Sequence, residues 1–90
     1  MESRETRSRV LKGGTIIQGS GRSEISCLLR NQSSAGAELK LAPEVQLPAA
    51  FQLYVATDGV AYDCILRWRK HDRAGVEFVG KGPKPKLHYG

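Results

Sequence analysis

Aromatic side chains are scarce in this 90-residue sequence, which contains three tyrosines, two phenylalanines and one tryptophan. Proteins that bind single-stranded nucleic acid usually combine a basic groove with several exposed aromatic rings. Most of the aromatic residues here fall at positions expected to face a core. Single-stranded DNA or RNA is therefore an unfavoured partner, although the net charge of +5 favours an anionic partner of some kind.

Long apolar runs are also missing from the sequence. None approaches the ~20 residues that a membrane-spanning helix requires, and no apolar segment follows the basic residues near the start. We therefore expect a soluble, cytoplasmic protein with no membrane partner.

Cysteine is rare, and neither Cys27 nor Cys64 has a neighbouring Cys or His at a metal-ligand spacing. We expect no metal site, and we predict that both thiols are buried and reduced, since disulfides are rare in cytosolic proteins.

Ser20, Ser33 and Ser34 have no paired histidine and carboxylate, so nucleophilic catalysis has no support. A chain of 90 residues buries only a small core. We predict a binding module without a cofactor rather than an enzyme.

Helical periodicity is absent, whereas apolar and polar residues alternate in six short segments. Four of the five turns between these segments carry glycine, proline or an Asp-Gly pair, and the fifth, 70–73, is polar, which is typical of hairpins. Six strands at hairpin spacing indicate an all-β fold, a six-stranded antiparallel β-barrel whose closure would remove exposed strand edges. The predicted strands are 10–17, 23–30, 37–41, 51–55, 60–69 and 74–79.

The sequence divides into three parts in this prediction. Residues 1–9 mix acidic, basic and hydroxyl side chains without periodicity, and we expect them to form a flexible, arginine-rich arm. Residues 10–79 would form the barrel, and the pair Gly13-Gly14 suggests a bulge or a sharply coiled strand there. Residues 80–90 are expected to be a disordered basic tail.

Strict alternation along 60–69 places Trp68 on the same face as Tyr62, Cys64 and Leu66. Large aromatic side chains are usually well buried in folded domains. We therefore expect Trp68 to belong to the core or to cover the barrel rather than to stack on a ligand.

A polar turn with the pattern Asn31-x-Ser33-x-x-Gly36 separates the second and third predicted strands. With the arginine-rich arm ahead of the first strand and the ending Gly75-Val76-Glu77-Phe78, this pattern resembles the PilZ domain family over about residues 4–79. The resemblance implies a six-stranded barrel that serves as a non-catalytic bacterial signalling module. It would bind cyclic di-GMP between an N-terminal RxxxR motif and a [D/N]xSxxG motif.

Cyclic di-GMP carries two phosphodiester charges and two guanine bases, so a receptor needs cations, flat stacking groups and hydrogen-bond acceptors. Arginine supplies the first two, because its planar guanidinium can fork onto phosphate or guanine and can also stack. Asn31 and Ser33 can accept from guanine N1–H and N2–H or simply cap the turn, and Arg30 is either a further contact or an ordinary surface residue. The ligand-binding residues that the resemblance implies are Arg4, Arg7, Arg9, Arg30, Asn31, Ser33 and Gly36.

The arm departs from the family pattern by one residue. A motif that ends at Arg7 would need arginine in place of Ser3, and one that ends at Arg9 would need arginine in place of Glu5. This departure supports an alternative function, in which a degenerate PilZ-like adaptor binds a protein partner without any nucleotide.

Overall fold

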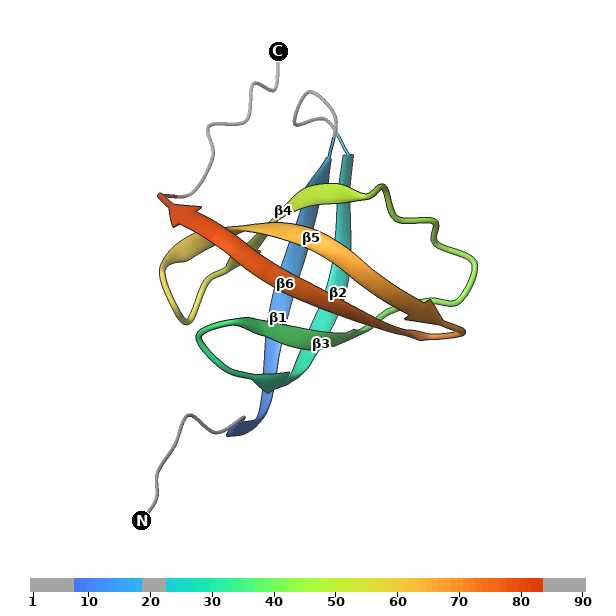
Figure 1. The fold of residues 1–90 in the computed structure, drawn as a ribbon, viewed down its shortest axis with the longest axis horizontal. Helices are drawn as coiled ribbons and strands as arrows, with labels where there is room; N and C mark the ends of the chain where they lie inside the picture. Colours follow the sequence, from blue (N-terminus) through green and yellow to red (C-terminus); the bar gives the residue numbers. More distant parts are fainter. Residues whose placement is uncertain (1–7, 19–22, 84–90) are drawn as a thin grey trace.

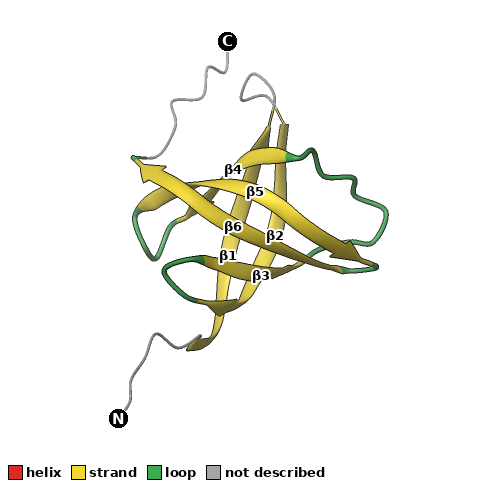
Figure 2. Ribbon diagram, in the orientation of Figure 1, coloured by secondary structure: helices red, strands yellow, loops and turns green. Residues whose placement is uncertain are grey.

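The structure, a computed structural model, describes residues 8–18 and 23–83, with the backbone alone described at residues 8–10 and 23. Six strands and no helix occur in these ranges (Figure 1, Figure 2). The strands are β1 (Ser8–Gln18), β2 (Ser23–Gln32), β3 (Gly36–Lys40), β4 (Ala50–Val55), β5 (Val60–Lys70) and β6 (Arg73–Gly82).

The six strands close into a barrel in the order β1-β2-β3-β6-β5-β4, and every neighbouring pair is antiparallel. The predicted fold class is therefore confirmed. In Figure 1 the β1–β2 hairpin crosses steeply behind β3, β6 and β5. Within the two described ranges there is no helix long and apolar enough to cross a membrane.

Two strands extend past the boundaries predicted for the barrel. β1 begins at Ser8, so Arg9 lies in the strand rather than in the arm. β6 continues to Gly82 instead of ending at residue 79. Both extensions pair with a neighbouring strand, and this pairing holds residues that show no alternation in the sequence. Residues 1–7 and 84–90, which hold most of the predicted arm and tail, lie outside the described residues.

The barrel interior is filled by side chains that alternate along the strands. Its largest fully buried side chains are Ile16, Leu29, Leu39, Leu53, Val55 and Cys64. Gly14 belongs to this packing, because an added Cβ would lie 2.7 Å from Leu29 Cδ1 and 3.1 Å from Leu53 Cδ1. A larger residue at this position would overfill the core.

Cys27 and Cys64 are free thiols buried in the core, as predicted. Burial raises the pKa of each thiol to about 12, so both stay protonated at neutral pH. A protonated, buried thiol is a poor nucleophile and acts mainly as a small apolar side chain.

Of the two alternatives expected at Gly13 and Gly14, a bulge or a sharply coiled strand, the bulge is wrong in position. Both glycines pair regularly with β2, and the irregularity in β1 lies earlier, between Arg9 and Lys12. The glycines are explained instead by the close packing around Gly14. The β1 irregularity lies opposite Arg30 of β2, where a second irregularity interrupts the pairing with β3.

Arg30 is an extra residue in the β2–β3 ladder. Leu29 pairs with Leu39 and Asn31 pairs with Glu38, so two residues that are adjacent in β3 face residues two apart in β2. Leu39 is fully buried, and Glu38 beside it therefore points outward. Asn31, paired with Glu38, also points outward, although Leu29 two positions earlier points into the core. A bulge reverses the alternation in this way because one inserted residue shifts every later side chain to the opposite face.

Arg67 occupies an equivalent position in β5. Leu66 pairs with Val76 and Trp68 pairs with Gly75, so Arg67 is the inserted residue. The predicted face of Trp68 is therefore wrong: the bulge turns the indole to the outside of the barrel, where it is 46% exposed.

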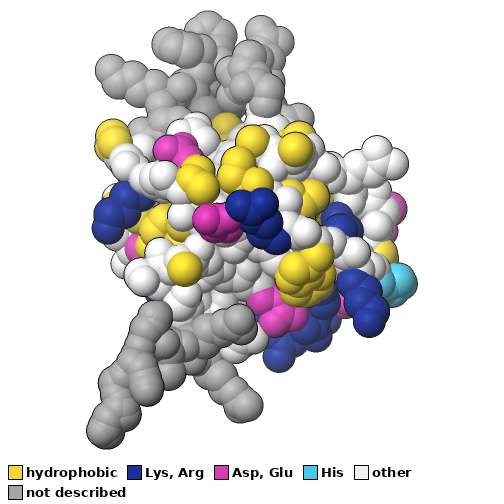
Figure 3. Space-filling model, in the orientation of Figure 1, with side chains coloured by type: hydrophobic (Ala, Val, Ile, Leu, Met, Phe, Trp, Pro, Cys, Tyr) yellow, Lys and Arg dark blue, Asp and Glu magenta, His cyan; other side chains and the backbone are white. Residues whose placement is uncertain are grey.

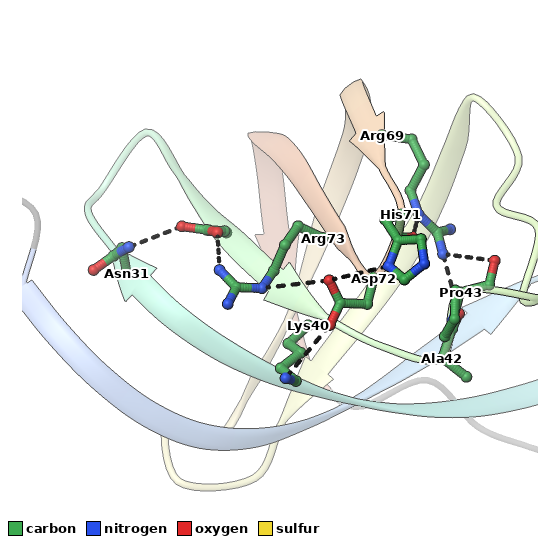
Figure 4. Close-up of polar contacts among 9 residues, drawn as sticks. Asn31, Lys40, Ala42, Pro43, Arg69, His71, Asp72 and Arg73 are labelled. Atoms are coloured by element: carbon green, nitrogen blue, oxygen red, sulfur yellow. Dashed lines mark hydrogen bonds and ion pairs between the residues drawn. The ribbon is translucent and has the colours of Figure 1, made fainter.

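One end of the barrel is covered by the loop 41–49, which Arg69 holds in place (Figure 4). The Arg69 guanidinium donates to the carbonyl oxygens of Val45 at 2.7 Å, Ala42 at 3.0 Å and Pro43 at 3.4 Å. It also donates to the carbonyl oxygen of His71, at 2.9 Å. Four backbone acceptors in the loop and in the β5–β6 turn are satisfied by this single side chain.

The other end is closed by a cluster of four polar side chains, Lys12, Gln32, Asp58 and Tyr62, which we term the polar plug. Lys12 Nζ lies 2.7 Å from Asp58 Oδ1 and 2.9 Å from Gln32 Oε1. The Tyr62 hydroxyl donates to Asp58 Oδ2 at 2.7 Å, and Gln32 Nε2 donates to the same oxygen at 3.0 Å. The Tyr62 ring stacks on Phe78, with ring centroids 4.1 Å apart. The plug thus joins β1, β2, β5 and the turn between β4 and β5.

The contacts in the polar plug shift the pKa values of two of its members. Burial opposes ionisation of Asp58, but the hydrogen bonds from Gln32, Lys12 and Tyr62 outweigh it and lower the pKa to about 2. Burial and the hydrogen bond to Asp58 raise the pKa of Tyr62 to about 12. The folded state therefore favours ionised Asp58 and neutral Tyr62.

We expect Asp58→Asn to destabilise the barrel by about 1.5–3 kcal/mol at pH 7, the usual range for hydrogen bonds to a charged group. The ionised carboxylate stabilises the fold fully above its unfolded pKa of 3.8, and this contribution is lost as the pH falls through about 2. Urea unfolding should be measured from pH 7 to pH 2. The difference in free energy of unfolding between wild type and variant should become smaller as the pH falls from 3.8 through about 2. Glu44→Gln, a charge change in the exposed loop 41–49, serves as the control. A gap of equal size at pH 7 and pH 2 would contradict this role of Asp58.

Candidate functional site

The predicted motif turn is shorter in the structure than in the sequence pattern. Asn31 is still in β2, Gly36 opens β3, and Ser33 through Ala35 form the turn proper. The Ser33 amide donates to the Gly36 carbonyl oxygen at 2.9 Å, and the Ala35 amide donates to Ser33 Oγ at 3.1 Å. Ser33 therefore caps the turn, and its hydroxyl retains a proton to donate.

Gly36 is required by the approach of β6. The Phe78 amide donates to the Ala35 carbonyl oxygen at 2.8 Å, which brings β6 against the start of β3. A Cβ added to Gly36 would overlap the Val76 carbonyl oxygen, which is backbone and cannot rotate away. Gly36 is thus a structural requirement of the site rather than a group that must itself touch a ligand.

Strand pairing places five residues in one row across the outside of the barrel. Arg9 pairs with Asn31, Asn31 with Glu38, Glu38 with Gly75, and Gly75 with Trp68. We term these residues the outer row; it crosses β1, β2, β3, β6 and β5 in turn. At Arg9 only the backbone is described. The outer row joins the predicted arm to the predicted turn and then to the tryptophan.

Glu38 is the centre of a chain of polar contacts on this surface (Figure 4). Its carboxylate accepts from Asn31 Nδ2 at 2.9 Å and from an Arg73 guanidinium nitrogen at 2.8 Å. Arg73 also lies 3.8 Å from Asp72, which pairs with Lys40 at 3.4 Å. The hydrogen bond from Arg73, assisted by that from Asn31, lowers the pKa of Glu38 although burial opposes the shift. Glu38 is therefore ionised at neutral pH.

A hollow of about 280 Å³ lies between the motif turn and the outer row. Its lining comes from the turn, β3, β5 and β6: Ser33, Ala35, Gly36, Ala37, Glu38, Arg67, Trp68, Gly75, Val76 and Glu77. Figure 3 shows the face that carries β3, β6 and β5, on which apolar side chains are interspersed with adjacent basic and acidic ones. The hollow thus combines a flat apolar surface with both signs of charge.

Two features of the hollow depend on the bulge at Arg67. The Arg67 guanidinium binds Glu77, with Nε 2.7 Å from Oε1, and a second nitrogen of the same group contacts that oxygen. The Trp68 indole lies over Gly75, where an added Cβ would overlap the indole nitrogen. Glycine at position 75 therefore lets the indole lie across β6 toward Glu38.

The structure brings together some of the predicted site residues. Ser33 and Gly36 line the hollow. Asn31 is not a lining residue, but it pairs with Glu38, which is one. Arg30 is half-buried at the bulge, and its charge helps to lower the pKa of Glu38. Arg9 is placed by its backbone, opposite Asn31, whereas Arg4 and Arg7 lie outside the described residues.

Sequence reasoning missed Glu38, Arg67, Trp68 and Gly75 as parts of this surface. Trp68 was assigned to the wrong face because alternation takes no account of a bulge. Glu38 could have been found from its place in the third predicted strand, opposite the residue that opens the motif.

Within the described residues, no group of three or more His, Cys, Asp or Glu side chains is arranged to hold a metal ion. Comparisons of the chain with family models, with curated proteins and with solved structures gave no match.

We expect Gly75→Ala to displace the indole of Trp68 from β6. The indole is half-exposed and can rotate away, so the loss of stability should be at the low end for overpacking, about 1 kcal/mol. Trp68 is the only tryptophan, and its fluorescence reports the displacement directly. Gly13→Ala is the control, because no atom lies within 4 Å of an added Cβ there. Identical emission spectra for wild type and Gly75→Ala would show that the indole does not rest on Gly75.

Proposed function

We propose that this barrel is a non-catalytic receptor module for cyclic di-GMP. The observation that carries the proposal is the hollow of about 280 Å³ at the motif turn, which Trp68 and Arg67 border on the opposite side. The hollow supports a ligand that has flat rings, anionic groups and hydrogen-bond donors. Two guanine bases joined by two phosphodiesters meet all three requirements.

Four side chains in or next to the hollow have a role in this proposal. Asn31 and Ser33 provide hydrogen-bonding groups for the guanine edge. The exposed indole of Trp68 offers a stacking surface, and base stacking on an aromatic side chain contributes about 1–3 kcal/mol per base. Arg67 can fork onto phosphate oxygens or onto guanine O6 and N7 if it exchanges Glu77 for the ligand. Binding of the ligand would therefore break the Arg67–Glu77 pair.

The register of β1 favours a contribution from the arginine arm. Ser8, which follows Arg7 in the sequence, pairs with Gln32, the residue before Ser33, so the start of β1 lies beside the motif turn. Arg4 precedes Arg7 by three residues, which corresponds to at most ~11 Å of extended backbone. The off-register spacing of these arginines is therefore compatible with contact to a ligand in the hollow.

Isothermal titration calorimetry of the full chain with cyclic di-GMP tests this function. We expect a Kd below ~100 μM. Loss of a charge-assisted contact in Arg7→Ala should weaken binding ~10-fold or more, and loss of an ordinary hydrogen bond in Ser33→Ala should weaken it ~5-fold. Ser26→Ala, at an exposed position of β2 away from the turn, is the matched control. No heat of binding at ~100 μM protein would overturn the receptor function.

A second function is favoured by the pairing of the described cations. Arg67 is bound to Glu77 and Arg73 to Glu38, so both guanidinium groups near the hollow already hold a carboxylate. With Ser3 at a family arginine position, this balance supports an adaptor that uses the same surface for a protein partner and needs no nucleotide. A pull-down that recovers one partner equally with and without cyclic di-GMP supports the adaptor. Recovery only in the presence of the nucleotide contradicts it.

A further inference from the structure

The contact between Asn31 and Glu38 bears on how the asparagine amide is oriented. An asparagine side chain ends in an oxygen that accepts hydrogen bonds and a nitrogen that donates them, and the two ends are similar in shape. Which end faces a ligand therefore depends on what fixes the other end. In this barrel the neighbour is Glu38, directly opposite on β3, at 2.9 Å from Asn31 Nδ2.

Glu38 can hold the amide in only one of these two orientations. An ionised carboxylate accepts hydrogen bonds and donates none. Arg73, 2.8 Å from the other carboxylate oxygen, keeps Glu38 ionised and keeps its carboxylate in place against β3. A reversed amide would set Asn31 Oδ1 against Glu38 Oε1, so that two acceptors would face each other without a proton between them.

We infer that Glu38 is a positioning residue that fixes the Asn31 amide with its nitrogen toward β3 and its oxygen, Oδ1, presented to the ligand. This inference rests on the proposed function for the identity of the ligand, and on the geometry of β2, β3 and β6 for the orientation. The group presented is an acceptor, which suits a base with adjacent N–H donors on its Watson–Crick edge. Guanine has two such donors, at N1 and N2, whereas adenine has one, at N6, next to the acceptor N1.

The inference reverses the usual expectation for an aspartate at position 31. A carboxylate offers more acceptor sites than an amide and would ordinarily suit the guanine edge better. Here Asn31→Asp would place a second carboxylate beside Glu38, and like charges at this separation repel each other. The substitution is therefore expected to weaken binding in this chain, and removal of the Glu38 charge should restore it.

The orientation is tested first in the free protein, by NMR of the Asn31 side-chain NH2 group. The charged groups that act on Glu38 are Arg73 on β6 and Arg30 on β2. Asp72 lies 3.8 Å from Arg73 and titrates in acid, so the spectra are recorded in the Asp72→Asn background. We expect the NH2 signals to shift as the pH falls below 4.5, the ordinary value for Glu38, and expect Glu38→Gln to abolish this titration.

The control for this experiment is Glu44→Gln, the same charge change in the loop 41–49. It should leave the titration of the Asn31 NH2 signals unchanged. If Glu38→Gln also leaves the titration unchanged, the inference is overturned, whether or not the protein binds a nucleotide. This readout separates failure of the inference from failure of the proposed function.

The consequence for recognition is tested by calorimetry with cyclic di-GMP on Asn31→Asp, Glu38→Gln and the double variant. We expect Asn31→Asp to bind cyclic di-GMP ~10-fold more weakly than wild type. The double variant should bind it at least ~5-fold more tightly than Asn31→Asp does. Thermal melts confirm that each variant is folded. Binding by Asn31→Asp that equals or exceeds wild type overturns the inference. A wild type that gives no heat overturns the proposed function instead and leaves the NMR result to decide the amide orientation.

Discussion

The extra residue in β2, Arg30, interrupts the pairing of this strand with β3, lies opposite an irregularity in β1, and sets the direction of the side chains that follow. Leu29 points into the core, and without the bulge Asn31 would do the same. The bulge sends Asn31 to the outer row and Gln32 to the polar plug. One local irregularity thus has two effects: it places Gln32 in the plug that closes the barrel, and it places Asn31 of the motif on the outer surface.

A second bulge, at Arg67, places the other side of the candidate site. It turns Trp68 outward onto Gly75, so that the indole lies across the surface toward Glu38. Bulges re-aim side chains at the cost of local ladder irregularity, and they commonly occur near functional sites. The two bulges lie on β2 and β5, which are not neighbours in the barrel, and the outer row connects them through β3 and β6. The site is therefore a property of the closed sheet rather than of one turn.

The charges on this surface are balanced by pairs. Glu38 holds Asn31 and Arg73, and Glu77 holds Arg67. These pairs are partly exposed, so each contributes little to stability. Their main effect is to fix the direction of side chains around the hollow. In the proposed function a ligand competes with Glu77 for Arg67, whereas Glu38 orients Asn31 before the ligand binds.

The sequence predicted the barrel because its strands alternate and its turns carry residues typical of hairpins. It also predicted the motif turn and the buried thiols, since these depend on local composition. It could not predict the faces of Asn31 and Trp68, because a single inserted arginine leaves no mark in the hydrophobic pattern. The adjacent glycines at 13 and 14 pointed to the wrong place, since a glycine needed for packing looks the same in sequence as one needed for a bulge. The partners of Asn31 follow from strand register, which is fixed only when the barrel closes.

NMR chemical-shift mapping can test whether the outer row and the hollow beside it form a nucleotide site, as we propose. Backbone amide and Trp68 indole signals would be followed during a titration of the full chain with cyclic di-GMP. We expect the shifts to concentrate at Asn31, Ser33, Trp68 and Gly75, with little change at Lys12 or Asp58 in the polar plug. Shifts confined to the polar plug, or spread evenly over the barrel, would contradict this proposal.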